Sequence, residues 1–325
     1  MLLRDVKLQD KVDLEMRKEK KESGTSAKIG KKIVKVLDGI VNWTVLATFL
    51  IFLLVGFYAI WDADQVFKIA DYKQYQMYKP TADDGDYSFA QLYEINPDVF
   101  AWLTVYGTNI DYPIVQTDNN DTYLNKNPLK EFSLAGSLFV DFRSGENFSD
   151  FSTIVYGHHM DKNAMFGELE KFRDRQFFDE HLYGNLYISN KDYGVQFFAF
   201  MEVDAYDADV YRVNVSAERV QDYLAVLLSK ASNTREISIE DTDRIVLLST
   251  CTSDSTNGRH ILIGKITDDT YEDVFAEDKT ITEVDTWSLW GILQTIPWWV
   301  YAIIIIAVLF LVDRIRRRGK HEKKK

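Results

Sequence analysis

The only cysteine of this 325-residue chain, Cys251, lies in a sequence context that is compatible with a reactive thiol. It ends an apolar run, residues 244–251, and a short polar loop closing with Asn257-Gly258 leads to a second apolar run that opens with Arg259. A lone cysteine has no internal disulfide partner, so it is either a buried thiol or a reactive one. If the two runs pair as a β-hairpin, which the Asn-Gly pair favours, the thiol and the guanidinium lie at one rim on strands about 4.8 Å apart.

A reactive thiol needs help near neutral pH, because a free cysteine has a pKa of roughly 8.5, and its usual partner is a histidine. Three of the five histidines are poorly placed for that role. His321 lies in the basic C-terminal tail, His260 alternates to the face opposite its neighbouring arginine, and His181 lies in a charged stretch. The adjacent pair His158 and His159 remains, directly after a glycine and an apolar run, which is typical of a strand end at a rim.

Two adjacent histidines rarely chelate one ion by themselves. No cysteine or carboxylate set with metal-ligand spacing accompanies this pair. We therefore expect neither a metal ion nor a cofactor.

The elements that must position these residues are mostly short strands. Eight apolar runs separated by turn signals predict a β-barrel or sandwich: 101–105, 110–115, 137–140, 153–156, 186–189, 194–203, 244–249 and 260–266. One segment before the cysteine run, 216–231, carries its apolar residues on one helical face and predicts an amphipathic helix packed on the strands. Helices are also expected over 63–78 and 87–94.

Two apolar stretches have the length to cross a membrane, 41–61 and 294–312. A cleavable signal peptide is the alternative for the first, but its apolar run is long and no Ala-x-Ala site follows it. Residues 1–40 carry 11 Lys and Arg and residues 313–325 carry 8, so both ends are predicted to be cytoplasmic.

The chain is thereby divided into seven parts. We predict a cytoplasmic basic tail (1–40), a transmembrane helix (41–61), an extracellular helical linker (62–85), a catalytic domain (86–275), a linker (276–293), a second transmembrane helix (294–312) and a second cytoplasmic basic tail (313–325). The net charge of −12 hides an acidic outer region between basic tails, and no nucleic-acid partner is expected. An exported domain with a single cysteine is more typical of a bacterial surface protein than of a eukaryotic one.

Taken together, these residues resemble a sortase of class B. The run Leu248-Ser-Thr-Cys251 followed by Arg259 is similar to the family's nucleophile strand and arginine, and Tyr156-Gly-His-His-Met160 is similar to its histidine segment. Further stretches fit the same class, in order: 96–102, 107–116, 136–143, the Met165-Phe166 pair and the helix at 216–231. The resemblance covers about residues 86–270.

The resemblance implies an eight-stranded β-barrel with N-terminal helices and one helix inserted before the cysteine strand, acting as a cysteine transpeptidase. It implies Cys251 as the nucleophile, His158 as the general acid and base, and Arg259 as the group that holds the substrate carbonyl and its oxyanion. Four further residues are expected to line the substrate groove: Ser249, Thr250, Thr252 and Tyr211.

The expected reaction cleaves a sorting-signal peptide through a cysteine thioester and transfers the acyl group to an amine. Two alternatives differ in the amine that accepts the acyl group. Transfer to a cell-wall precursor would anchor surface proteins to the wall of a Gram-positive bacterium, and transfer to a lysine of a pilin would polymerise pilins. A third alternative is an inactive, membrane-tethered binding protein.

Two departures from class B bear on this choice. A second membrane span resembles the pilin-polymerising class C, whereas the class C lid signature, Asp-Pro followed by an aromatic residue, is absent. The loop between Cys251 and Arg259 is also short for class B.

Overall fold

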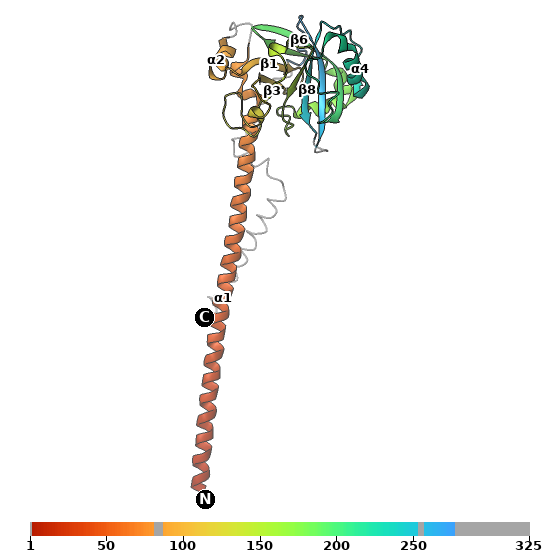
Figure 1. Ribbon diagram of the computed structural model, residues 1–325. Coiled ribbons are helices and arrows are strands. Elements are labelled where there is room, and N and C mark those ends of the chain that lie inside the picture. Colours follow the sequence, from red (N-terminus) through yellow and green to blue (C-terminus); the bar gives the residue numbers. More distant parts are fainter. Residues whose placement is uncertain (1, 81–86, 253–256, 277–325) are drawn as a thin grey trace. The chain divides into compact units, whose positions relative to one another are not determined.

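The computed structural model describes residues 2–80, 87–252 and 257–276 (Figure 1). Residues 1–273 form one compact unit. The predicted second transmembrane helix, the linker before it and the C-terminal tail lie outside the described residues, apart from residue 276.

Eight strands close into a barrel and a ninth joins it from one side. The bounds are β1 Val99–Val105, β2 Asp111–Val115, β3 Leu138–Val140, β4 Ser152–Tyr156, β5 Tyr183–Ile188, β6 Lys191–Asp204, β7 Ala231–Thr234, β8 Arg244–Cys251 and β9 Gly258–Thr267. The sheet order is β5-β1-β2-β3-β4-β8-β9-β6-β7, and a further β5–β6 pairing closes the ring of eight. The predicted mostly-β, eight-stranded barrel is confirmed.

The bounds of the eight expected strands differ from the observed ones by up to three residues, and a ninth strand was not expected. The strand expected at 186–189 begins at Tyr183 and ends at Ile188, because Ser189 and Asn190 have φ values of 50° and 63° and form the turn into β6. The strand β7 was not predicted at all. Its four residues, Ala-Ser-Asn-Thr, offer no apolar alternation from which to infer a strand.

Helices and 3₁₀ turns connect the strands. The α-helices are α1 Leu2–Ala70, α2 Tyr87–Ile95, α3 Arg175–Glu180 and α4 Val220–Lys230; the 3₁₀ turns are η1 Tyr72–Gln74, η2 Gln76–Tyr78, η3 Thr122–Leu124, η4 Glu146–Phe148, η5 Gly167–Arg173 and η6 Ala217–Arg219. The helix expected over 216–231 is thus present as η6 and α4.

The alternation of β8 divides the apolar residues between two cores. Val246 and Leu248 belong to the core inside the barrel, whereas Ile245 and Leu247 belong to a second core beneath α4. That helix lies on the outside of the barrel (Figure 1), in contact with β6 and β7, and buries Val220, Tyr223, Leu224 and Leu227. The strand that ends at the cysteine is therefore buried on both faces.

The first membrane-length stretch lies within α1. Residues Gly30–Ala70 of this helix are long and apolar enough to cross a membrane. The helix expected over 63–78 continues only to Ala70. There Asp71 adopts an extended backbone and caps η1 by accepting a hydrogen bond from the backbone N–H of Lys73 at 3.0 Å.

A buried carboxylate ties the segment after α1 to the barrel. Asp111, at the start of β2, accepts hydrogen bonds from Gln76 at 3.0 Å and from the ammonium of Lys79 at 2.8 Å. Its other oxygen accepts from the indole of Trp102 and the hydroxyl of Thr104, both at 2.8 Å. With four donors its buried charge is satisfied, so the helical segment is fixed on the barrel.

Candidate active site

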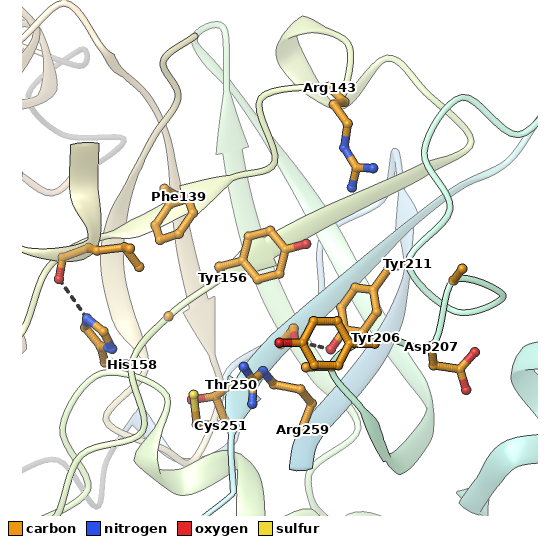
Figure 2. Close-up of a pocket in the computed structure, with 15 residues that line it drawn as sticks. Phe139, Arg143, Tyr156, His158, Tyr206, Asp207, Tyr211, Thr250, Cys251 and Arg259 are labelled. Carbon is orange, nitrogen blue, oxygen red and sulfur yellow. Dashed lines mark hydrogen bonds between the residues drawn. The ribbon is translucent and has the colours of Figure 1, made fainter. Parts of the chain in front are cut away.

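The β8–β9 hairpin places the thiol and the guanidinium opposite each other. Cys251 pairs in register with Arg259, at the end of the antiparallel ladder next to the loop that connects the two strands. The Cys251 thiol is exposed rather than buried, and both side chains line a cavity of about 550 Å³ (Figure 2). The Arg259 guanidinium donates to the carbonyl of Gly258 at 2.8 Å, which steadies it at the rim.

Parallel pairing of β4 with β8 brings a histidine to the same rim. Tyr156 pairs with Ser249, and the backbone N–H of Gly157 donates to the carbonyl of Ser249 at 3.1 Å. Because the carboxyl ends of parallel strands meet at one edge, His158 follows β4 where Cys251 ends β8. His158 lines the cavity together with the thiol.

The orientation of the His158 ring follows from one hydrogen bond. Nε2 lies 2.7 Å from the carbonyl oxygen of Leu124. A carbonyl only accepts, so Nε2 carries the proton, and in the neutral ring Nδ1 then holds the lone pair. This is the tautomer in which Nδ1 is the nitrogen able to take a proton.

Glycine is required immediately before this histidine. A Cβ on Gly157 would stand 2.5 Å from Leu138 Cδ2 and 2.6 Å from Phe166 Cδ2, closer than real side chains approach. The backbone N–H of Phe166 also donates to the carbonyl of His158 at 3.0 Å. The fit between β3 and the loop after β4 therefore positions the ring.

The two neighbouring histidines have other environments. His159 does not line the cavity, and its Nε2 lies 3.8 Å from a carboxylate oxygen of Glu170. His260 points away from the cavity, as strand alternation predicts, and is buried beside the ring of Phe200. Burial lowers the pKa of His260 below its usual value, since the charged form loses hydration.

Three of the four predicted groove residues lie at the cavity and one does not. Ser249, Thr250 and Tyr211 line it, and the hydroxyls of Tyr211 and Ser249 lie 2.9 Å apart. Burial raises the pKa of Tyr211 to about 12, so the phenol stays protonated and able to donate. Thr252 is not among the lining residues; its backbone N–H instead donates to the carbonyl of Gly258 at 3.0 Å.

The far wall of the cavity was not predicted from the sequence. Arg143 lines it and is held by Asp141, whose two carboxylate oxygens accept from the guanidinium at 2.9 and 2.8 Å. Tyr156 donates to the same carboxylate at 3.1 Å and stacks on Tyr211 with ring centroids 6.3 Å apart. Burial alone would raise the pKa of Asp141, but the bonds from Arg143 outweigh it and the pKa is lowered.

Some signal for this wall was present in the sequence. Residues 136–143 belong to the stretches that resemble class B sortases, yet nothing in their spacing predicts that Arg143 lies at the same cavity as the cysteine. Tyr206 and Asp207, which also line the cavity, follow β6 in a loop without periodicity.

An exposed thiol, an imidazole and a guanidinium that line one cavity at the rim of a closed eight-stranded barrel are the features of a sortase-type cysteine transpeptidase. The chain belongs to the class B sortases. It is 35% identical over 180 residues to sortase B of Listeria monocytogenes, which corresponds to 54% of this chain and 72% of that protein. No family model matches the sequence.

Solved structures give the same assignment. The structure of sortase B from the type II pilus of Streptococcus pneumoniae is 46% identical, with a TM-score of 0.50 over 56% of this chain and 99% of the other. A Streptococcus pyogenes class B sortase involved in pilus biogenesis is 41% identical, with a TM-score of 0.51 over 55% and 97% of the two chains. The matching part is thus the class B catalytic core.

Proposed function

We propose that Cys251 forms the acyl-enzyme. Its thiolate attacks a backbone carbonyl carbon of a sorting-signal peptide, the C–N bond breaks, and the peptide's N-terminal part remains as a thioester on sulfur. The leaving amine takes a proton from the His158 imidazolium. The exposure of Cys251 in a cavity that His158 and Arg259 also line carries this proposal.

Arg259 supplies the charge that the reaction needs. As the carbonyl becomes tetrahedral its oxygen gains negative charge, and a fixed guanidinium opposite Cys251 stabilises it by about 3 kcal/mol, as oxyanion donors do elsewhere. In the second half-reaction a primary amine attacks the thioester, Nδ1 of His158 accepts its proton, and the cysteine leaves as a thiolate. Ser249, Thr250 and Tyr211 are proposed to hold the peptide.

For the acceptor, a lysine of a pilin is the first candidate. The pneumococcal and S. pyogenes enzymes reported above, described as pilus sortases, are more identical to this chain than sortase B of Listeria. An amine of a cell-wall precursor is the second candidate. It is favoured by the lack of any Asp-Pro pair, and hence of the class C lid signature, in the sequence.

We further propose that α1 anchors the enzyme in the membrane with the barrel outside the cell. Its apolar segment Gly30–Ala70 supports the first span, while the second span at 294–312 rests on sequence alone. Both basic tails are then cytoplasmic.

The acceptor is tested with the full chain in lipid nanodiscs, a pilin that carries a sorting signal, and a wall-precursor analogue. A ladder of covalent pilin multimers on a denaturing gel, lost in Cys251→Ala, is expected. Transfer to the wall precursor alone would refute the pilin assignment and leave the transpeptidase intact. If neither product forms and Cys251→Ala changes nothing, the chain is a tethered binding protein.

A further inference from the structure

Three large apolar side chains are exposed to solvent on the loop between β2 and β3, beside the active site. Leu124, Phe132 and Leu134 are 41%, 71% and 61% exposed, and we call them the apolar lip. Leu124 lines the cavity, and its carbonyl accepts the His158 hydrogen bond (Figure 2). A cluster of this kind marks a surface that meets something apolar.

The lip is held rigidly in this exposed arrangement. Lys126 pairs with Phe132 in an isolated β-bridge, and the backbone N–H of Ser133 donates to the carbonyl of Asn125 at 3.0 Å. Inside the loop the side chain of Asn127 accepts from two backbone N–H groups, at 3.0 and 2.9 Å. The backbone of the loop is therefore fixed by hydrogen bonds, and in this fixed conformation the apolar side chains remain exposed to solvent.

The lip lies on the part of the barrel that α1 joins. Tyr75 is buried, and burial raises the pKa of its phenol. The negative charge of Glu131, next to Phe132 in sequence, raises this pKa further. Tyr75 in turn donates to the carbonyl of Ile69 at 3.2 Å, in the last turn of the helix. On the loop after His158, the ammonium of Lys162 stands 4.4 Å from the ring centroid of Phe67.

The loop that carries the lip presents charges of both signs. Lys126 and Lys130 are exposed on it, as are the carboxylates of Asp121 and Glu131; the ammonium of Lys130 lies 3.7 Å from an Asp98 oxygen, and Glu131 accepts from Asn127. Phenylalanine and leucine flanked by lysine are the composition of segments that bury their apolar side chains at a lipid interface and leave the ammonium groups among the headgroups.

We propose that the apolar lip inserts into the headgroup region of the phospholipid membrane that α1 is proposed to span. This inference rests on the proposed membrane anchoring by α1. Because Leu124 belongs both to the lip and to the cavity wall, insertion keeps His158 and Cys251 at the membrane surface. Substrates that are themselves held in the membrane then reach the thiol without leaving the lipid surface.

The single native cysteine makes the test direct. In a Cys251→Ser background of the full chain, Phe132→Cys and Leu134→Cys each carry a nitroxide label, in nanodiscs that contain phosphatidylglycerol. Paramagnetic broadening by oxygen, which partitions into lipid, is compared with that by a water-soluble nickel chelate. Tyr206→Cys, 82% exposed at the cavity, is the aqueous control, and Phe52→Cys in α1 is the lipid control.

We expect oxygen to broaden the spectra of the labels at 132 and 134 several-fold more than the nickel chelate does, as for the label at 52. The label at 206 is expected to be broadened more by the nickel chelate. Aqueous labels at 132 and 134 with a lipid-exposed label at 52 would overturn the lip and leave the anchor in place. An aqueous label at 52 would overturn the anchor itself.

A second pair of variants, Phe132→Glu and Leu134→Glu, separates the membrane from a protein partner. Both sites are exposed, so the fold tolerates the change. We expect turnover of a membrane-held substrate to fall about five-fold or more, while turnover of a soluble peptide is unchanged. An equal loss on both substrates would mean that the lip contacts the substrate protein, against the proposal.

Discussion

At the scale of single residues, the site depends on how closely β3 and the loop after β4 fit around His158. The ring has one fixed hydrogen bond, to the carbonyl of Leu124, and its backbone passes Leu138 and Phe166 through a position that only glycine fits. The placement of His158 thus depends on Leu138 and Phe166, which do not line the cavity.

Gly157→Ala is therefore expected to displace His158. Adding a Cβ at 2.5 Å from Leu138 forces the loop to shift, and we expect kcat/KM for a fluorogenic sorting-signal peptide to fall at least ten-fold, with about 1–3 kcal/mol of stability lost. Gly56→Ala, where a new Cβ meets nothing within 4 Å, is the matched control and should leave both quantities unchanged. Wild-type activity in Gly157→Ala would contradict this positioning.

His260 is expected to make the fold sensitive to mild acid. Its pKa is lowered by burial, so it stays neutral in the folded protein while the unfolded chain binds a proton below about pH 6.5. This stability is complete above that pH and is lost as the pH falls towards the folded-state pKa. The pKa of His260 is also affected, to a smaller extent than by burial, by the charges of Glu202, Arg173, Glu170 and His159.

The free energy of unfolding, measured with denaturant at pH 7.5, 6.5 and 5.5, should decline less steeply in His260→Phe than in the wild type. Parallel curves for the two proteins would show that His260 is not responsible.

The trio itself was accessible from sequence to different degrees. Cys251 and Arg259 follow from two apolar runs around an Asn-Gly turn, because register in a short hairpin is local information. Choosing His158 over His159 needed the family resemblance, since the parallel pairing of β4 and β8 joins residues that are 93 positions apart in sequence, such as Tyr156 and Ser249. Arg143 was missed because its guanidinium is held at the cavity by a hydrogen bond to Asp141, and the spacing of residues along the sequence does not predict this bond.

At the scale of elements, local patterns predicted what local forces determine. The strands β8 and β9 and the helix α4 carry clear periodicity, and they are present where expected. The strand β7 is polar, and it pairs with the edge of β6 at residues 199–201, beyond the part of β6 that pairs with β5. The end of α1 at Ala70 was missed because it depends on the Asp71 cap and on contacts with β2, such as the bond from the Tyr112 hydroxyl to the Ala70 carbonyl at 2.8 Å.

Asp111→Asn should loosen the segment between α1 and α2. The amide keeps the size of the carboxylate but loses the charge that faces Lys79, and its NH₂ group accepts from no donor. We expect a loss of about 2–3 kcal/mol in unfolding free energy and faster limited proteolysis near residue 79. Asp118→Asn, an exposed position, should change stability by no more than about 0.5 kcal/mol. Equal stability of the two variants would remove Asp111 as the anchor.

At the scale of the whole molecule, the charge distribution and the two apolar stretches predict which parts of the chain face the cell exterior. A membrane-impermeant maleimide applied to intact cells should label Cys251, the only thiol, from outside. In Cys251→Ala carrying Lys325→Cys, labelling should require permeabilised cells. Labelling of the C-terminal cysteine in intact cells would contradict two spans with both tails inside.

The central claim is that Cys251 carries the acyl group between a peptide and an amine. It is tested most directly by the intact mass of the full chain in detergent after brief incubation with a panel of sorting-signal peptides. We predict a mass increase on Cys251 equal to the acyl group of the peptide's N-terminal fragment, that is, the fragment less one water. The increase should disappear within minutes of adding a lysine-containing acceptor. Accumulation should fall about a hundred-fold or more in Arg259→Ala and be absent in Cys251→Ala. Cleaved peptide with no adduct on Cys251, or an adduct that no amine discharges, would contradict the account.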